Sequence, residues 1–172
     1  RDDVESRGLG DVYKRQTDDA EMIRRIILCA ALVLSAGAQA QDRFEQAVAL
    51  IKQAEGMHSA QHHPYVGYGH RLRPGEQFTA GITEERADSL LRSDLRQKCR
   101  VFRRFGSDSL LLGVLAYNVG EYRLLGYGEH PKSRLIEKLE AGDRDIYGEY
   151  VSFRKYKGKV LPSLERRRKM EF

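Results

Sequence analysis

Apolar residues recur at helical spacing in several separate stretches of this chain. The first stretch predicts a helix that ends at Glu55, because Gly56 suits the left-handed backbone conformation that closes many helices. The apolar face of this helix is formed by Phe44, Val48, Ile51 and Ala54. Residues 58–78 have no helical period and are rich in Gly, Pro, His and Tyr. We expect a β-hairpin there, with a first strand over residues 65–70, a turn near residues 74–75 and a return strand.

A long helix is predicted to begin after Thr83, whose hydroxyl suits an N-cap, and to end before Gly106. Residues 107–120 are apolar nearly all round, which predicts a buried central helix. Shorter helices are expected over residues 132–141, over residues 143–153 and after residue 162. The sequence therefore predicts a mostly helical α+β domain with two lobes, a small β-hairpin lobe and a helical lobe, and a ligand cleft between them.

The first 40 residues divide into two parts of different character. Residues 1–21 are polar and unpatterned, so we expect a disordered extension or an artefact rather than native protein. Residues 22–40 begin with a pair of arginines, continue with an apolar stretch and end with the small-residue motif Ala38-Gln39-Ala40. This order predicts a secretory signal peptide, and export of residues 41–172 to the periplasm or the extracellular space.

Composition and charge narrow the range of partners. The 172 residues are 41% hydrophobic and 32% charged, which suits one globular domain with a substantial core. Residues 41–172 contain 24 Lys and Arg against 18 Asp and Glu, so the exported part is basic. We expect a monomer that binds no nucleic acid, because export and the lack of a nucleic-acid motif argue against it. Contacts with anionic wall or membrane surfaces are expected through Arg166, Arg167, Arg168 and Lys169.

Glu55 is the candidate catalytic residue. Its carboxyl lies at the end of a helix and faces a glycine-rich segment, and the last helical carbonyls carry a partial negative charge that favours a protonated carboxyl. A general acid needs that form. Four histidines follow, at positions 58, 62, 63 and 70. Their spacing matches no metal-ligand pattern, so we expect neither a metal nor a cofactor.

Several sequence blocks together resemble the phage-type lysozymes of glycoside hydrolase family 24. The blocks are Glu55-Gly56, Gly67-Tyr68-Gly69-His70, Ile82-Thr83-Glu84, Leu115-Ala116-Tyr117-Asn118-Val119-Gly120, Ser133-Arg134-Leu135-Ile136 and Gly158-Lys159-Val160-Leu161-Pro162. The resemblance implies a lysozyme-like catalytic domain over residues 41–172. It also implies cleavage of the β-1,4 bond between N-acetylmuramic acid and N-acetylglucosamine in peptidoglycan, with Glu55 as the general acid.

The chain departs from the family pattern at two positions of the site. The family has an Asp shortly after the Glu and a Thr just before the glycine-rich segment. Here no Asp or Glu occurs between Glu55 and Glu76, and Tyr65 stands at the Thr position. Both usual glycosidase mechanisms employ two carboxylates, so the resemblance leaves open which group acts with Glu55.

Three explanations are open for the missing carboxylate. In the first, His63 or His62 supplies the base, because neutral imidazole can activate a water molecule. In the second, the enzyme is a lytic transglycosylase in which Glu55 acts alone and the substrate's own 6-hydroxyl attacks. In the third, the domain binds glycan without turnover. The catalytic candidates are thus Glu55, His63, His62 and Tyr65. The candidate substrate contacts are Gly67, Tyr68, Gly69, His70, Tyr117 and Asn118.

Overall fold

The computed structural model describes residues 24–29, 35, 37–76, 78 and 82–172. The chain divides into two compact units, residues 1–43 and residues 44–172. In the first unit, residues 24–29 and 37–43 are helical and exposed. The extension expected over residues 1–21, and part of the expected signal peptide, lie outside the described residues. In the described ranges, no helix combines the length and the apolar character needed to cross a membrane.

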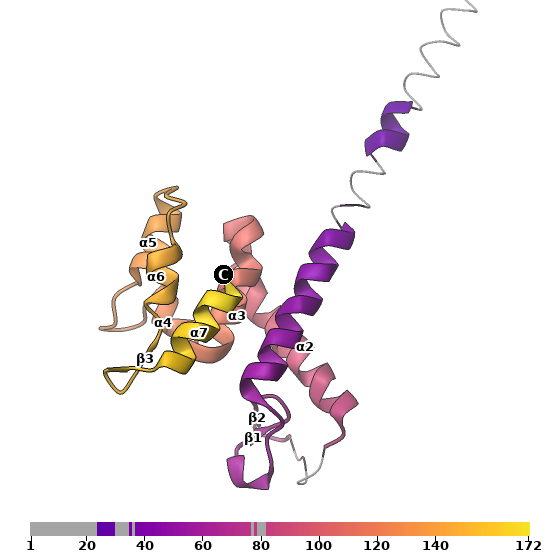
Figure 1. Cartoon of the computed structure of the whole chain (residues 1–172). Helices are drawn as coiled ribbons and strands as arrows, with labels where there is room; N and C mark the ends of the chain where they lie inside the picture. The colour runs from indigo at the N-terminus through magenta and orange to yellow at the C-terminus, as the bar shows by residue number, and fades with distance from the viewer. Residues whose placement is uncertain (1–23, 30–34, 36, 77, 79–81) are drawn as a thin grey trace, which may run out of the picture. The chain divides into compact units, whose positions relative to one another are not determined.

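The second unit is mostly helical and carries two short antiparallel hairpins (Figure 1), which confirms the predicted α+β class. Residues 44–55 form its first helical stretch. The elements that follow are η1 (Ala60–His62), β1 (Tyr65–Val66), β2 (His70–Arg71), α2 (Glu84–Val101), η2 (Arg103–Asp108), α3 (Ser109–Val119), α4 (Tyr122–Leu125), α5 (Arg134–Glu140), α6 (Tyr147–Val151), β3 (Lys155–Tyr156), β4 (Lys159–Val160) and α7 (Pro162–Glu171).

The strands of the β lobe span other residues than predicted. β1 lies within the segment predicted as the first strand and β2 begins at its last residue, and Val66 pairs with His70. The chain turns between them at Gly67 and Gly69, whose φ angles of 58° and 98° are accessible to glycine at little steric cost. In the segment after residues 74–75 where a return strand is predicted, residues 76 and 78 are not in a strand, and residues 77 and 79–81 lie outside the described residues. The alternating glycines form a tight turn instead of the interior of one strand.

The predicted helices are present with shifted ends. The Thr83 hydroxyl accepts a hydrogen bond from the Arg86 backbone N–H at 3.2 Å, which confirms the N-cap of α2. α2 ends at Val101, earlier than expected, because a separate 3-10 segment, η2, leads to α3. α5 begins two residues later than expected, after Ser133, which caps it. The sequence pattern missed α4 and the β3–β4 hairpin, both of which are too short to show a period.

Two hydrophobic clusters form the core of the second unit, and α3 contributes to both, which confirms its prediction as the central helix. The first cluster joins the 44–55 helix, the β lobe and α2, and consists of Ala47, Val48, Ile51, Tyr68, Ala87, Leu91, Leu95 and Val114. The second joins α3 to the helices that follow, and consists of Phe102, Leu112, Leu115, Ala116, Leu124, Leu135, Ile136, Ile146 and Tyr150. The first cluster holds the end of the 44–55 helix beside the glycine turn.

Candidate active site

Glu55 is the last residue of the 44–55 helix, and Gly56 follows it with a φ of 65°, as the sequence predicts for a helix end. The Glu55 side chain is 21% exposed. Arg167 of α7 donates a hydrogen bond from Nη1 to Glu55 Oε1 at 2.8 Å, and another from Nε to Glu171 Oε1 at 2.7 Å. This buried guanidinium fixes the direction of the Glu55 carboxyl. It also places a positive charge beside this carboxyl.

Gly69 brings three functional side chains around one point. A Cβ atom added to Gly69 would lie 4.0 Å from Glu55 Cγ, 3.8 Å from His58 Cε1 and 3.8 Å from Tyr117 Cε1. A carboxyl, an imidazole and a phenol ring therefore surround the space in front of this residue. Because glycine carries no side chain, the space is open to another group.

Gly69 and Tyr117 also line a cavity of about 790 Å³. Its walls are residues 63–65, residues 69–74, Glu76, Asp94, Gln97, Lys98 and Tyr117. Glu55 is not in these walls but lies next to them, because Gly69 belongs to the cavity and also faces the Glu55 side chain. A volume of this size accommodates a small ligand or several sugar units of a longer chain.

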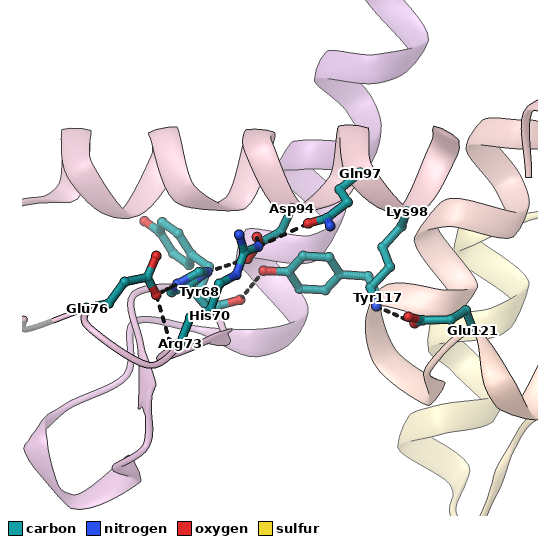
Figure 2. A network of polar contacts seen from close by, with 9 residues as sticks. All are labelled: Tyr68, His70, Arg73, Glu76, Asp94, Gln97, Lys98, Tyr117 and Glu121. Carbon is teal, nitrogen blue, oxygen red and sulfur yellow. Dashed lines mark hydrogen bonds and ion pairs between the residues drawn. The ribbon is translucent and has the colours of Figure 1, made fainter. Parts of the chain in front are cut away.

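Tyr117 closes the site from α3. Its hydroxyl donates a hydrogen bond to the backbone oxygen of Tyr68 at 2.9 Å (Figure 2). Burial raises the pKa of Tyr117 well above its usual value, and the charges of Asp94 and Glu55 raise it further, so the hydroxyl remains a donor. The Tyr68 side chain is only 9% exposed and packs in the first core cluster, so its backbone, not its ring, faces Tyr117.

His70 joins the β lobe to α2 through a network of polar contacts (Figure 2). Its Nδ1 is hydrogen-bonded to Asp94 Oδ2 at 2.6 Å, and its Nε2 to Glu76 Oε2 at 2.9 Å. Arg73 extends the network by donating to Asp94 at 3.1 Å and to Gln97 at 3.0 Å. Because carboxylates are already bonded to both ring nitrogens and the ring is only 3% exposed, His70 is a structural residue of the cavity wall.

Replacing Glu76 with glutamine is expected to destabilise the fold at neutral pH and to have little effect in acid. The hydrogen bond with His70, and then that with the Arg73 backbone N–H, lower the pKa of Glu76. Its stabilising contribution is therefore complete above the unfolded pKa of about 4.3 and is lost as the pH falls through the lowered value. Urea unfolding of both proteins between about pH 7 and pH 3 measures this difference. An exposed control, Glu129→Gln, should show no such convergence, and a gap for Glu76→Gln that persists in acid would contradict the assignment.

The remaining histidines of the loop have different surroundings. His62 and His63 are exposed, and His63 lines the cavity beside Tyr65, which is 43% exposed. The Nδ1 atom of His62 lies 3.1 Å from both the backbone N and the hydroxyl of Ser59. His58 is half-buried and is the histidine whose ring adjoins Gly69 and Glu55. His58 is not among the predicted catalytic residues, although it lies only three residues after Glu55. Among the described residues, no group of three or more His, Cys, Asp or Glu is arranged to hold a metal ion.

The basic cluster near the C-terminus differs from the prediction. Arg168 is fully buried and Arg167 is 8% exposed, so these two residues cannot contact a wall or membrane surface. Their guanidinium groups are directed inward to Glu55, Glu171 and Asn118. Only Arg166 and Lys169 of the cluster are exposed. Arg167 and Arg168 can be buried because carboxylate and amide acceptors, two of them distant in sequence, compensate their charge.

Comparison with known families identifies the fold. The family model described as phage lysozyme matches residues 51–171. The chain belongs to the phage lysozyme family. This match includes Glu55, the β lobe and all of the later helices up to Glu171.

Solved structures similar to this lysozyme include an endolysin and a muramidase domain. The endolysin from Escherichia coli O157:H7 phage FAHEc1 has a TM-score of 0.57 and 22% identity, with 73% of this chain and 87% of that chain covered. The muramidase domain of SpmX from Asticaccaulis excentricus has a TM-score of 0.55 and 23% identity, with coverage of 73% and 91%. At these identities the similarity shows a shared fold. No curated protein matches this lysozyme in sequence.

Proposed function

We propose that this lysozyme is an exported, monomeric muramidase that degrades peptidoglycan. It cleaves the β-1,4 bond between N-acetylmuramic acid and N-acetylglucosamine, and Glu55 protonates the leaving glycosidic oxygen. The biological result is breakdown of the bacterial cell wall. Family membership and the names of the similar structures support the substrate class.

The arrangement around Gly69 is the observation that carries this proposal. A carboxyl at a helix end is held by Arg167 beside Gly69, and Gly69 and Tyr117 line a cavity large enough for sugar units. The glycine turn and Tyr117 shape the space without filling it. An acid fixed next to a glycan groove is the basic requirement for general acid catalysis of glycoside cleavage.

A lytic transglycosylase is the second candidate, and one observation favours it. No Asp or Glu occurs between Glu55 and Glu76, and Glu76 is committed to His70 and to the Arg73 backbone. A transglycosylase needs a single carboxyl that acts first as acid and then as base, because the substrate's own 6-hydroxyl takes the place of water. Glycan binding without turnover is the remaining alternative.

The products of peptidoglycan digestion distinguish these functions. Purified, insoluble peptidoglycan is incubated with the protein, and the soluble fragments are analysed by mass spectrometry with and without borohydride reduction. We expect reducing N-acetylmuramic acid ends, which gain the mass of two hydrogens on reduction. Anhydromuramic ends, which lack the elements of water and resist reduction, would instead identify a transglycosylase. Retention of the protein on the wall without soluble fragments would contradict both enzymatic functions.

A further inference from the structure

We propose that His58, rather than His62 or His63, is the second catalytic residue of this lysozyme, the base that takes a proton from the attacking water. This inference rests on the proposed function, in which Glu55 is the acid. It assigns the role that an Asp has in the family pattern to an imidazole from a different position of the loop.

The position of the ring is the first argument. His58 Cε1 and Glu55 Cγ both lie within 4.0 Å of the point in front of Gly69. The His58 backbone N–H donates to the Gly67 oxygen at 2.7 Å, so the residue is tied to the same glycine turn that creates this point. The Glu55 carboxyl and the His58 imidazole therefore border the same small space in front of Gly69.

The orientation of the ring is the second argument. The His62 ring stacks on the His58 ring, with centroids 4.7 Å apart and planes at 14°. The Tyr65 ring contacts His58 edge-on, with centroids 6.3 Å apart and planes at 87°. Two aromatic neighbours thus fix the imidazole plane before any substrate binds, as general base catalysis requires. These contacts give His62 and Tyr65 positioning roles rather than catalytic ones.

The surroundings of His58 also keep it neutral, which is the form that a base must have. Its Nδ1 atom is buried and has no hydrogen-bond partner among the described residues. Because Nδ1 is enclosed, the proton from water reaches the ring at Nε2, and the neutral ring that acts as base carries its hydrogen on Nδ1. Burial lowers the pKa of His58, the neighbouring His62 lowers it further, and Glu55 acts in the opposite direction.

The other histidines are less suited to this role. His70 has both nitrogens bonded to carboxylates and is buried. The Nδ1 of His62 is bonded to Ser59, and its ring covers that of His58. His63 is exposed in the cavity wall, where no neighbouring ring is found to hold it among the described residues.

Glu55 and His58 together account for the protons transferred in the reaction. Water attacks the anomeric carbon, its oxygen forms the new bond to that carbon, and one of its protons passes to His58. The bond from the anomeric carbon to the leaving oxygen breaks, and Glu55 gives that oxygen its proton. The pair ends as a carboxylate beside an imidazolium, so the charge that develops on each group is stabilised by the other. Proton exchange with solvent then restores the starting forms.

The decisive experiment measures hydrolysis by His58→Gln in the full chain. Glutamine keeps a polar side chain but takes up no proton near neutral pH, so we expect kcat for fragment release to fall by about 10²–10⁴-fold. Binding to insoluble peptidoglycan and the thermal unfolding temperature should stay close to those of the wild type. His62→Gln and His63→Gln should lose less activity than His58→Gln. His130→Gln, at an exposed position outside the site, is the matched control with wild-type activity.

Chemical rescue separates a catalytic role from a structural one. Free imidazole is added to His58→Ala, and we expect a concentration-dependent recovery of hydrolysis that His130→Ala does not show. If either His58 variant fails to fold, His58→Asn provides the same comparison. Activity of His58→Gln within about threefold of wild type, absence of rescue in a folded His58→Ala, or a larger loss in His63→Gln would each overturn the proposal.

A parallel Glu55→Gln protein keeps the two hypotheses distinguishable. An inactive Glu55→Gln with an active His58→Gln refutes the base and leaves the acid. An active Glu55→Gln refutes the acid, and with it the proposed function on which this inference rests. Anhydromuramic products from the wild type would overturn the His58 assignment and the proposed hydrolysis, because no water is then activated, but would leave Glu55 as the acid.

Discussion

Glu55→Gln is expected to abolish peptidoglycan cleavage, with a fall in rate of about 10²–10⁴-fold. Glutamine cannot donate the proton that the leaving oxygen needs, but its amide oxygen can still accept the hydrogen bond from Arg167 Nη1. The side chain has nearly the same size, and Glu171 continues to pair with Arg167. The measurement is the initial rate of fragment release from purified peptidoglycan, with wall binding determined by co-sedimentation.

The matched control for this variant is Glu137→Gln, which makes the same chemical change at an exposed position on α5. It should retain the wild-type rate. Glu55→Gln should also retain wall binding and cooperative unfolding, since the lost group is required by the chemistry and not by the core. A Glu55→Gln protein with more than about a tenth of wild-type activity would show that another group is the acid.

Arg168→Met is expected to lower the free energy of unfolding by about 3–5 kcal/mol. The Arg168 side chain is completely buried, and it donates to the backbone oxygen of Phe153 at 3.1 Å and to Glu171 and Asn118. Methionine fills a similar volume but leaves these acceptors with fewer donors in a buried region. Urea unfolding at neutral pH gives the difference directly.

Two further variants define the cause of this loss. Arg168→Lys should recover only part of the stability. Arg168 reaches its three partners from three different nitrogens, whereas all the donors of lysine sit on one nitrogen. Arg166→Met, in the adjacent exposed position, should change the free energy of unfolding by no more than about 0.5 kcal/mol. An Arg168→Met protein within about 1 kcal/mol of wild type would indicate that the buried charge costs nearly as much as its contacts return.

The histidine loop shows why the site was only partly predictable. In the sequence, His58, His62 and His63 are equivalent members of one polar segment, and His63 and His62 were the favoured candidates for the base. Their different surroundings arise from the turn at Gly67 and Gly69, which the pattern had suggested to be a strand. A short hairpin has too few residues to establish a period, so its register depends on the packing of its neighbours.

The burial of two arginines in the basic run from Arg166 to Lys169 could not be predicted from the sequence either. A cluster of four cations usually lies on a solvated surface, and nothing local in the sequence marks two of them as buried. The partners that make burial possible are Glu55, Asn118 and Glu171, and the first two are far away along the chain.

The sequence by itself determined the helical α+β class, the buried central helix and the place of Glu55 at a helix end. Those features depend on local periodicity, capping residues and glycine, which act over a few residues and are legible in the order of amino acids. Only the tertiary structure decided which groups surround Glu55. Arg167, His58, Gly69 and Tyr117 come from separate parts of the chain. The first hydrophobic cluster packs the 44–55 helix, the β lobe and α3 together, and the ion pair with Glu55 brings in Arg167 of α7.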